Sequence, residues 1–180
     1  LFAARYAREH GLTVSYDPNL RRNLWSDEQT ARQYIREGLN LCDVAKLSDE
    51  ECTFLCGDGE IDALGRRLLA EHPNLKLLFV TCGAGGSYAF CGSRMAFVPG
   101  FSVKIADTTG AGDAFVGAVL YQILRRGGLR EAYSPAELEQ LLTFGNAVGA
   151  LSVQRYGAIP SIPTLAETES FLRAQGLLGA

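Results

Sequence analysis

The chain has 180 residues, of which 47% are hydrophobic, and a formal net charge of −3. This composition suits one globular domain with its own core, and the mild acidity argues against a nucleic-acid-binding surface. No apolar run approaches the roughly 18 residues of a membrane-spanning segment, and no signal peptide is recognisable. We therefore expect a cytoplasmic protein.

The five cysteines have no spacing typical of a disulfide framework. Cys52 and Cys56 are four residues apart and could place two metal ligands on one helix face, but no second pair has a matching spacing. We therefore expect reduced thiols rather than a metal site. The chain starts with Leu1 inside a predicted helix, which suggests a fragment of a longer protein.

Predicted helices and strands alternate along the chain. The first half gives a helix at 1–10, a strand at 12–16, a helix from the capping box at 26–29 to about 39, a strand at 42–47, a short helix from the capping box at 48–51 to Gly57, and a helix at 61–71. The second half gives a strand at 75–81, paired strands at 87–91 and 94–98, and helices at 114–124, from Ser134 to about 154, and from Thr164. This order predicts an α/β three-layer sandwich with a mainly parallel sheet and one late hairpin.

The stretch from Asp107 to Phe115 lies between a strand-like apolar run and a buried helix. Gly110 and Gly112 would leave backbone N–H groups uncovered at the positive end of that helix, where a phosphate binds well. Asp113 lies in the same first turn. A carboxylate there would repel a resting phosphate, unless it accepts a proton from a group that attacks the phosphate.

Other interpretations of this glycine turn are weaker. The chain contains no Walker-type loop, and the dinucleotide fingerprint fails because Phe115 occupies the position of its third glycine. An aspartate in a first turn is commonly just a favourable partner of the helix dipole. The density of two threonines, two glycines and two aspartates within seven residues favours a functional site.

The stretch Asp107-Thr-Thr-Gly-Ala-Gly-Asp113 resembles the signature of the ribokinase-like (PfkB) carbohydrate kinases. Further segments resemble the fructokinase branch in the same order, and together they span nearly the whole chain: 17–21, 24–25, 46–51, 81–86, Asn146 and 157–161. The resemblance implies a single partial domain over residues 1–180. It would be the C-terminal, nucleotide-binding portion of a kinase that lacks the N-terminal strands and the lid.

The resemblance also implies the catalytic groups. Asp113 would be the base that takes the proton from the attacking sugar hydroxyl, and the N–H groups of Gly110, Ala111 and Gly112 would stabilise the charge on the transferred phosphate. The implied nucleotide-binding residues are Asn19, Arg21, Thr81, Gly83, Gly85, Gly86 and Asn146. Taken alone, the glycine loop could be an ordinary turn, Arg21 a solvated arginine and Asn146 a capping or core residue.

Two cation sites follow from the resemblance. Many relatives carry Asn-x-x-Glu for the water shell of Mg²⁺, whereas here the aligned residues are Lys46 and Asp49. Asp49 or Glu51 could still contact Mg²⁺ through water, although residues 48–51 also form a capping box. A second set matches positions that bind a monovalent cation such as K⁺: Asp107, Thr109, Ser152, Gly157 and Ser161.

The sequence therefore predicts an ATP-dependent sugar kinase, with fructose as the expected substrate and fructose 6-phosphate as the product. The alternatives are a 2-keto-3-deoxygluconate or nucleoside-type kinase of the same family, a catalytically silent interaction module, and a dinucleotide-binding oxidoreductase domain. The expected partners are ATP and a sugar, with neither nucleic acid nor membrane. The family resemblance implies a homodimer for a full-length protein.

Overall fold

A computed structural model describes residues 1–178, which fold around a five-stranded sheet with helices on both faces. The strands are β1 (Ser15–Tyr16), β2 (Val44–Ser48), β3 (Leu77–Thr81), β4 (Ser87–Cys91) and β5 (Arg94–Val98). The helices are α1 (Phe2–Glu9), α2 (Glu28–Leu39), α3 (Asp49–Cys56), α4 (Ile61–Glu71), α5 (Ala111–Arg125), α6 (Pro135–Ser152) and α7 (Leu165–Ala174). Short 3₁₀ turns lie at η1 (Arg22–Leu24), η2 (Gly83–Gly85) and η3 (Ile159–Ser161).

The sheet has the order β1-β2-β3-β4-β5 and is mixed. The pairs β1–β2 and β2–β3 are parallel, whereas β3–β4 and β4–β5 are antiparallel. The parallel part is therefore smaller than the sequence suggested. The reason is the tight glycine loop after Thr81, which is too short for the crossover that a parallel neighbour needs, so β4 returns beside β3. The β4–β5 hairpin is confirmed.

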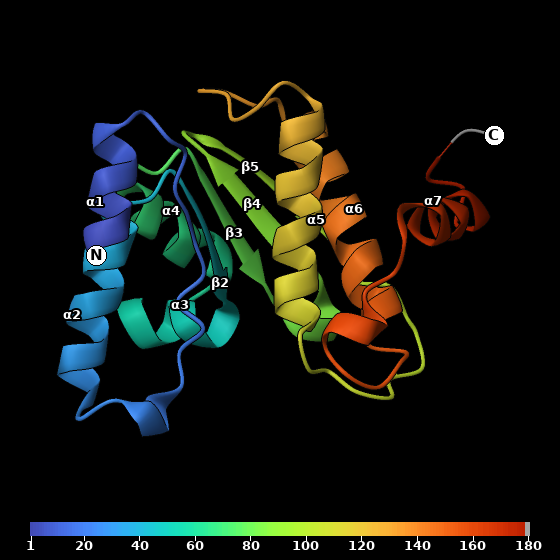
Figure 1. Ribbon diagram of the computed structural model, residues 1–180, viewed down its shortest axis with the longest axis horizontal. Coiled ribbons are helices and arrows are strands. Elements are labelled where there is room, and N and C mark those ends of the chain that lie inside the picture. Colours follow the sequence, from blue (N-terminus) through green and yellow to red (C-terminus); the bar gives the residue numbers. More distant parts are fainter. Residues whose placement is uncertain (179–180) are drawn as a thin grey trace.

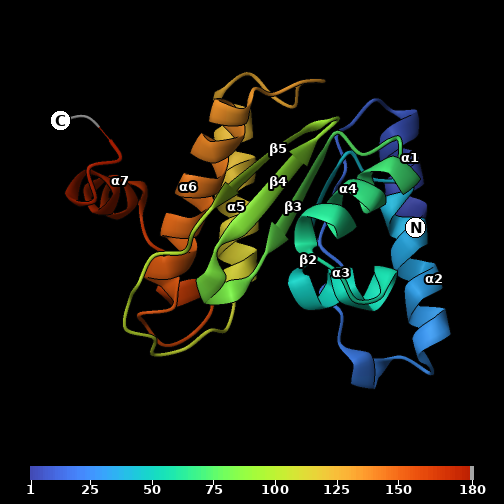
Figure 2. The same cartoon turned by 180° about the vertical axis from the view of Figure 1, so that it is seen from behind.

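The two faces of the sheet carry separate cores, and this confirms the three layers. Leu47, Leu78 and Val80 pack against α2, α3 and α4. Phe79 and Ala89 point to the opposite face and pack against α5 and α6. Figures 1 and 2 show α5 and α6 together on one side of the sheet, with α7 beyond α6. Side chains alternate between the two faces along each strand, so successive strand residues belong to different cores.

Three helices start at capping boxes. The box at Ser48 was expected from the sequence, whereas Ser134 and Thr164 were expected only as helix starts. Ser48, Ser134 and Thr164 each accept a hydrogen bond from the N–H three residues on, and the glutamate there bonds back to the capping residue's N–H. The predicted box at 26–29 is wrong. Asp27 caps α2 instead, by accepting from the Thr30 N–H, because its carboxylate reaches that donor while Ser26 lies one residue too early.

The segment between β5 and α5 is a loop rather than a continued strand. Pairing stops at Val98, and residues 99–110 run along the end of the sheet to Gly110. Helix α5 starts at Ala111, three residues before the predicted start, so Gly112 and Asp113 lie in its first turn. Among residues 1–178, no helix is long and apolar enough to cross a membrane.

Candidate active site

The site lies where the parallel strands end. Ser48 and Thr81 are the last residues of β2 and β3 and are paired across the sheet. Asp17 follows β1 at the same edge, and the N-terminus of α5 lies at this end of the sheet. In open α/β sheets, ligands bind outside the carboxyl ends of the strands, so the fold places the expected binding site at this edge.

The first turn of α5 differs from the other helix starts. Gly110 is the N-cap residue with φ of +79°, a conformation that glycine adopts without strain, and it provides no capping side chain. The Ala111 N–H donates to the Thr108 carbonyl at 3.2 Å, and intrahelical bonding starts with Ala114. Within residues 1–178, the N–H groups of Gly110, Gly112 and Asp113 therefore have no acceptor. These free donors at the positive helix end form a site for an anion.

This geometry leaves fewer of the expected N–H groups available to an anion. Gly110 and Gly112 have free N–H groups as the motif implies, but the Ala111 N–H is already engaged. Ala111 can still contribute its position, since it lines the adjoining cavity together with Gly112. The Asp113 N–H is an additional free donor that the motif did not indicate.

Asp113 is the third residue of α5, the position that a glutamate holds in each of the three capping boxes. The carboxylate of each of those glutamates accepts a hydrogen bond from the N–H of the capping residue. The Asp113 side chain is exposed and, within residues 1–178, makes no hydrogen bond or ion pair. Its carboxylate is therefore free to accept a proton from a bound molecule.

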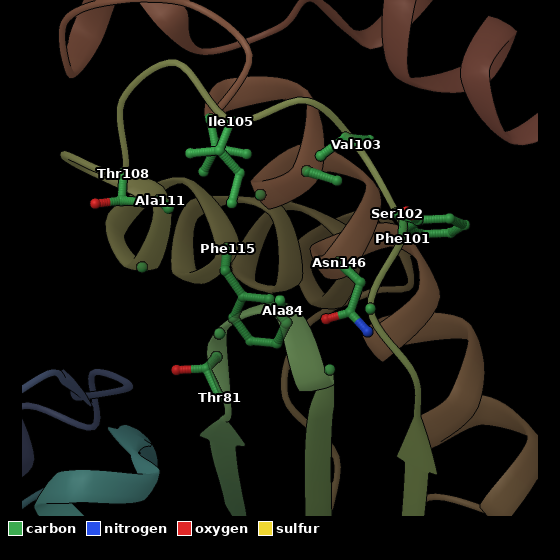
Figure 3. A pocket seen from close by; sticks show the side chains of 17 residues that line it. Thr81, Ala84, Phe101, Ser102, Val103, Ile105, Thr108, Ala111, Phe115 and Asn146 are labelled. Carbon is green, nitrogen blue, oxygen red and sulfur yellow. The ribbon is translucent and has the colours of Figure 1, made fainter.

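A cavity of about 410 Å³ opens beside the first turn of α5. Its size falls in the range of small-molecule sites, about 300–1,000 Å³. Figure 3 shows Val103 and Ile105 entering it from the loop after β5, with Thr81 on the opposite side at the end of β3. Phe101 anchors that loop, because its ring packs edge-on against Phe171 of α7 at 5.0 Å. The apolar walls suit the face of a planar ring, and the α5 end suits a phosphate.

The glycine loop after β3 forms one wall of this cavity. Thr81, Gly83, Ala84 and Gly86 line it, whereas Gly85 does not. The Gly85 N–H donates to the Cys82 carbonyl at 2.9 Å, so Gly85 closes the turn rather than facing the cavity. Gly86 has φ of +112°, and a Cβ there would lie 2.2 Å from the Val98 carbonyl oxygen. Close packing against the 98–100 turn therefore requires a glycine.

Asn146 of α6 contacts the same wall, but its side-chain amide makes hydrogen bonds to other residues of the protein. Its Oδ1 accepts from the Ser87 hydroxyl at 2.7 Å, and its Nδ2 donates to the Val98 and Pro99 carbonyls. Asn146 therefore holds the start of the 99–110 loop, and it lines the cavity beside Gly149 and Ala150. This arrangement supports the core-residue interpretation for its polar atoms.

Asn19 and Arg21 line a second cavity of about 290 Å³ at the same sheet edge. Asn19 has a positive φ of +48°, and its Oδ1 accepts a hydrogen bond from the Arg21 guanidinium. Both side chains are exposed. Asn19 therefore holds the guanidinium locally at the wall of this cavity, and a guanidinium fork suits the binding of an anion.

The expected Mg²⁺ contacts have unequal geometry. Glu51 is buried, and its two carboxylate oxygens accept from the N–H groups of Leu20 and Ser48 at 2.6 and 2.8 Å. It thus fixes the 17–21 segment to α3, a structural task. Asp49 is half-buried, and among residues 1–178 its carboxylate accepts only from the Glu50 N–H, which leaves an oxygen for a metal-bound water. Within residues 1–178, no group of three acidic, histidine or cysteine side chains forms a metal cage.

The residues of the expected monovalent cation site lie around the loop that precedes α5. Asp107 accepts from the N–H groups of Thr109 and Gly157 at 2.9 and 3.0 Å. The Thr109 side chain, together with these two N–H groups, holds the pKa of the Asp107 carboxyl below the usual range. The Ser152 and Ser161 hydroxyls donate to the Gly149 and Ala158 carbonyls, so their oxygens keep free lone pairs. The set is rich in oxygen and could hold a cation.

Comparison with known proteins assigns the chain to a family. The model of the pfkB family carbohydrate kinases matches residues 1–165. The chain belongs to the pfkB family. It is 42% identical over 171 residues to fructokinase-2 of Solanum lycopersicum, which covers 95% of this chain and 51% of that protein. The chain thus spans about half the length of the curated relatives it matches.

Solved structures agree with the pfkB assignment. A fructokinase from Vibrio cholerae O395, crystallised with fructose, ADP and a potassium ion, is 34% identical with a TM-score of 0.83, and the match covers 95% of this chain and 54% of that one. A fructokinase from Xylella fastidiosa with bound ATP is 33% identical with a TM-score of 0.86, covering 97% and 56%. The expected ribokinase-like α/β fold is confirmed, and the oxidoreductase alternative is excluded.

Sequence reasoning missed one neighbour of the pfkB signature. Lys46 in β2 is buried, and a Cβ on Gly112 would lie 2.9 Å from its Nζ. Lys46 appeared in the sequence only as a departure from the family's metal motif. A signal was present nonetheless, because a lysine in an otherwise apolar core strand needs a specific reason to be there.

Proposed function

We propose that this chain is the nucleotide-binding portion of an ATP-dependent sugar kinase that phosphorylates a primary hydroxyl, with fructose as the substrate and fructose 6-phosphate as the product. One observation carries the proposal: α5 starts with free N–H groups and an unspent carboxylate beside a cavity of nucleotide size. A binding module would have no use for an unpaired base at an anion site.

The chemistry follows from this arrangement. The base and ribose of ATP occupy the 410 Å³ cavity, and the phosphates extend toward the N-terminus of α5. Asp113 accepts the proton of the attacking hydroxyl as its oxygen bonds to the γ-phosphorus and the bond to the ADP oxygen breaks. The N–H groups of Gly110 and Gly112 stabilise the charge on the transferred group, because fixed donors need no reorganisation.

Mg²⁺ accompanies ATP in this proposal and neutralises phosphate charge when it is bound. Asp49 would hold it through water, since among residues 1–178 one oxygen of this carboxylate accepts no hydrogen bond. K⁺ would bind near Asp107 and order the loop that leads to Gly110. The potassium ion in the Vibrio cholerae fructokinase supports this part of the proposal.

The choice of fructose rests on the fructokinase relatives, both plant and bacterial. The 2-keto-3-deoxygluconate and nucleoside-type kinases of the same family stay as alternatives, as does a silent module. We also propose a reducing compartment such as the cytoplasm, which suits the free thiols found among the described residues.

A coupled assay of ADP formation tests the proposal. The whole kinase, of which we propose this chain to be the nucleotide-binding portion, is incubated with Mg-ATP and K⁺, and fructose, 2-keto-3-deoxygluconate and a nucleoside are added in turn. We expect ADP formation that depends on fructose and produces fructose 6-phosphate. Faster turnover with another acceptor would replace the substrate. ATP binding without turnover on any acceptor would favour the silent module.

A further inference from the structure

Lys46 is a buried cation in the middle of β2. It is 9% exposed, and its strand neighbours Ala45 and Leu47 are fully buried in the core under α2, α3 and α4. Because side chains alternate along a strand, Lys46 points to the opposite face, toward α5. Burying a lysine in such a place is costly unless its charge is compensated.

The protein itself compensates this charge weakly. Asp17 accepts from the Lys46 ammonium at 3.3 Å, and among residues 1–178 this is the hydrogen bond that Nζ makes. An ammonium has three donors, so two remain without an acceptor in the described part of the chain. Asp17 comes directly after β1, whose Tyr16 pairs with Ala45, so the sheet register brings the two charged groups together.

The position of the ammonium is electrostatically unfavourable in the unliganded protein. Its Nζ lies beside Gly112, where a Cβ would approach it to 2.9 Å. Gly112 is the second residue of α5, at the positive end of the helix dipole, and a cation there is repelled. The ammonium and the helix N-terminus are both positive, so an anion bound next to both of them would stabilise both.

We propose that Lys46 binds the terminal phosphate of ATP, together with the free N–H groups of α5. This assignment rests on the proposed function and adds a residue to it. Lys46 also lines the second cavity with Arg21, so its charge continues the anion site from that arginine to Gly112. A lysine acts here as a point charge that follows the phosphate and needs no bidentate geometry.

The competing explanation is a structural ion pair between Lys46 and Asp17. It predicts that the two residues matter equally and that both nucleotides are affected alike. Our assignment predicts a difference between ATP and ADP, because ADP lacks the phosphate that Lys46 contacts.

Calorimetric titration of Mg-ATP and Mg-ADP into the wild-type chain and into Lys46→Gln separates the two explanations. We expect Lys46→Gln to weaken ATP binding about ten-fold or more, the loss expected for a charge-assisted hydrogen bond, and ADP binding less than three-fold. Lys76→Gln is the matched control. Lys76 also pairs with a carboxylate, that of Glu131, but lies just before β3 at the other end of the sheet. It should change neither affinity.

Asp17→Asn keeps the test decisive if Lys46→Gln does not fold. This variant removes the pair but leaves the ammonium, so it should keep the preference for ATP over ADP. Equal weakening of both nucleotides in Lys46→Gln, or loss of the ATP preference in Asp17→Asn, would overturn the assignment. A wild-type chain that binds neither nucleotide would instead overturn the proposed function, and this assignment with it.

Discussion

Asp113 stands apart from the other acidic residues that open helices in this chain. Glu51, Glu137 and Glu167 hold the same third position, but each bonds back to a serine or threonine cap. In α5 a glycine replaces the cap and a shorter aspartate replaces the glutamate. No side chain caps the start of α5, so its N–H donors and the Asp113 carboxylate can bind a ligand. Such a departure from the usual capping pattern is typical of a functional site.

The first prediction concerns this carboxylate. Asp113→Asn should lower the turnover of fructose by about 10²–10⁴-fold, the range for loss of a general base. It should lower the melting temperature only slightly, because the side chain makes no hydrogen bond or ion pair among residues 1–178 and loses only its interaction with the helix dipole. Steady-state kinetics and thermal unfolding measure the two effects. Asp58→Asn, at another exposed aspartate, is the control. A turnover within a few-fold of wild type would refute the assigned role.

The second prediction concerns Asp107. Asp107→Asn should weaken the hydrogen bonds from Thr109 and Gly157, because the carboxylate that accepts them becomes a neutral amide. We expect the K⁺ concentration for half-maximal activity to rise several-fold, while the affinity for ATP changes less. Activity titrations with KCl at constant ionic strength would measure this. An unchanged K⁺ dependence would place the cation elsewhere.

Among the elements, the glycine loop after β3 combines a structural with a binding role. Gly86 is confined by the Val98 carbonyl, whereas a Cβ on Gly83 would meet nothing within 4 Å. Both have positive φ. The loop is therefore rigid where it packs against the 98–100 turn and open where it faces the cavity.

The third prediction follows from this contrast. Gly83→Ala should destabilise the protein by about 1–2 kcal/mol, the cost of a left-handed alanine. Gly86→Ala should cost more, because its backbone clash forces the 98–100 turn to move. Urea unfolding of the two variants measures the difference. Equal destabilisation would mean that the turn adapts easily.

The capping boxes make the stability of the fold depend on pH. Hydrogen bonds at Ser134, with the Arg130 guanidinium, lower the pKa of Glu137 to about 2. A carboxyl whose pKa is lowered on folding stabilises the fold above its ordinary pKa of about 4.5, and this stabilisation is lost as the pH falls toward 2.

The fourth prediction uses this sign. Glu137→Gln should lower the melting temperature at pH 7, and the gap between variant and wild type should shrink as the pH falls below 4. Thermal unfolding between pH 7 and pH 3 would show it. Glu139→Gln, two residues on in the same helix, serves as the control, since Glu139 belongs to no capping box. A gap that is constant with pH would contradict the mechanism.

At the scale of the whole molecule, much of the fold follows from local sequence signals. The helices after Ser48, Ser134 and Thr164 begin as predicted, because capping boxes act over four residues. The helix at 61–71 also begins as predicted, although no side chain caps it. The antiparallel return of β4 follows from the short loop after Thr81 and not from the periodicity of the strands, so periodicity alone overestimated the parallel part of the sheet. The α2 cap was misassigned, since two acceptors, Ser26 and Asp27, stand side by side.

The candidate site shows the same division. The motif around Gly110 and Asp113 was readable because its residues are consecutive. The contact of Lys46 with Gly112 joins residues 66 positions apart, and the engagement of the Ala111 N–H depends on the exact turn geometry. The sequence predicts a metal contact at Glu51, because it gives no indication that the Leu20 N–H, 31 residues away, donates to this carboxylate.

The chain spans about half the length of its curated relatives, and residues of this chain line both cavities at the sheet edge. The fifth prediction follows. ATP at one hundred times its Kd should stabilise the chain by about 2.7 kcal/mol, visible as a rise in melting temperature. Asp113→Asn should keep this rise, because the carboxylate is a base and not a nucleotide ligand. No rise in the wild type would argue against the nucleotide site.

The central claim is that the terminal phosphate of ATP meets the N-terminus of α5 beside Asp113. A crystal structure of the chain with a non-hydrolysable ATP analogue tests it most directly. We predict the base in the cavity under Val103 and Ile105, and the γ-phosphate within hydrogen-bonding distance of the Gly110 and Gly112 N–H groups. An analogue bound elsewhere, or one whose phosphates point away from α5, would contradict the account.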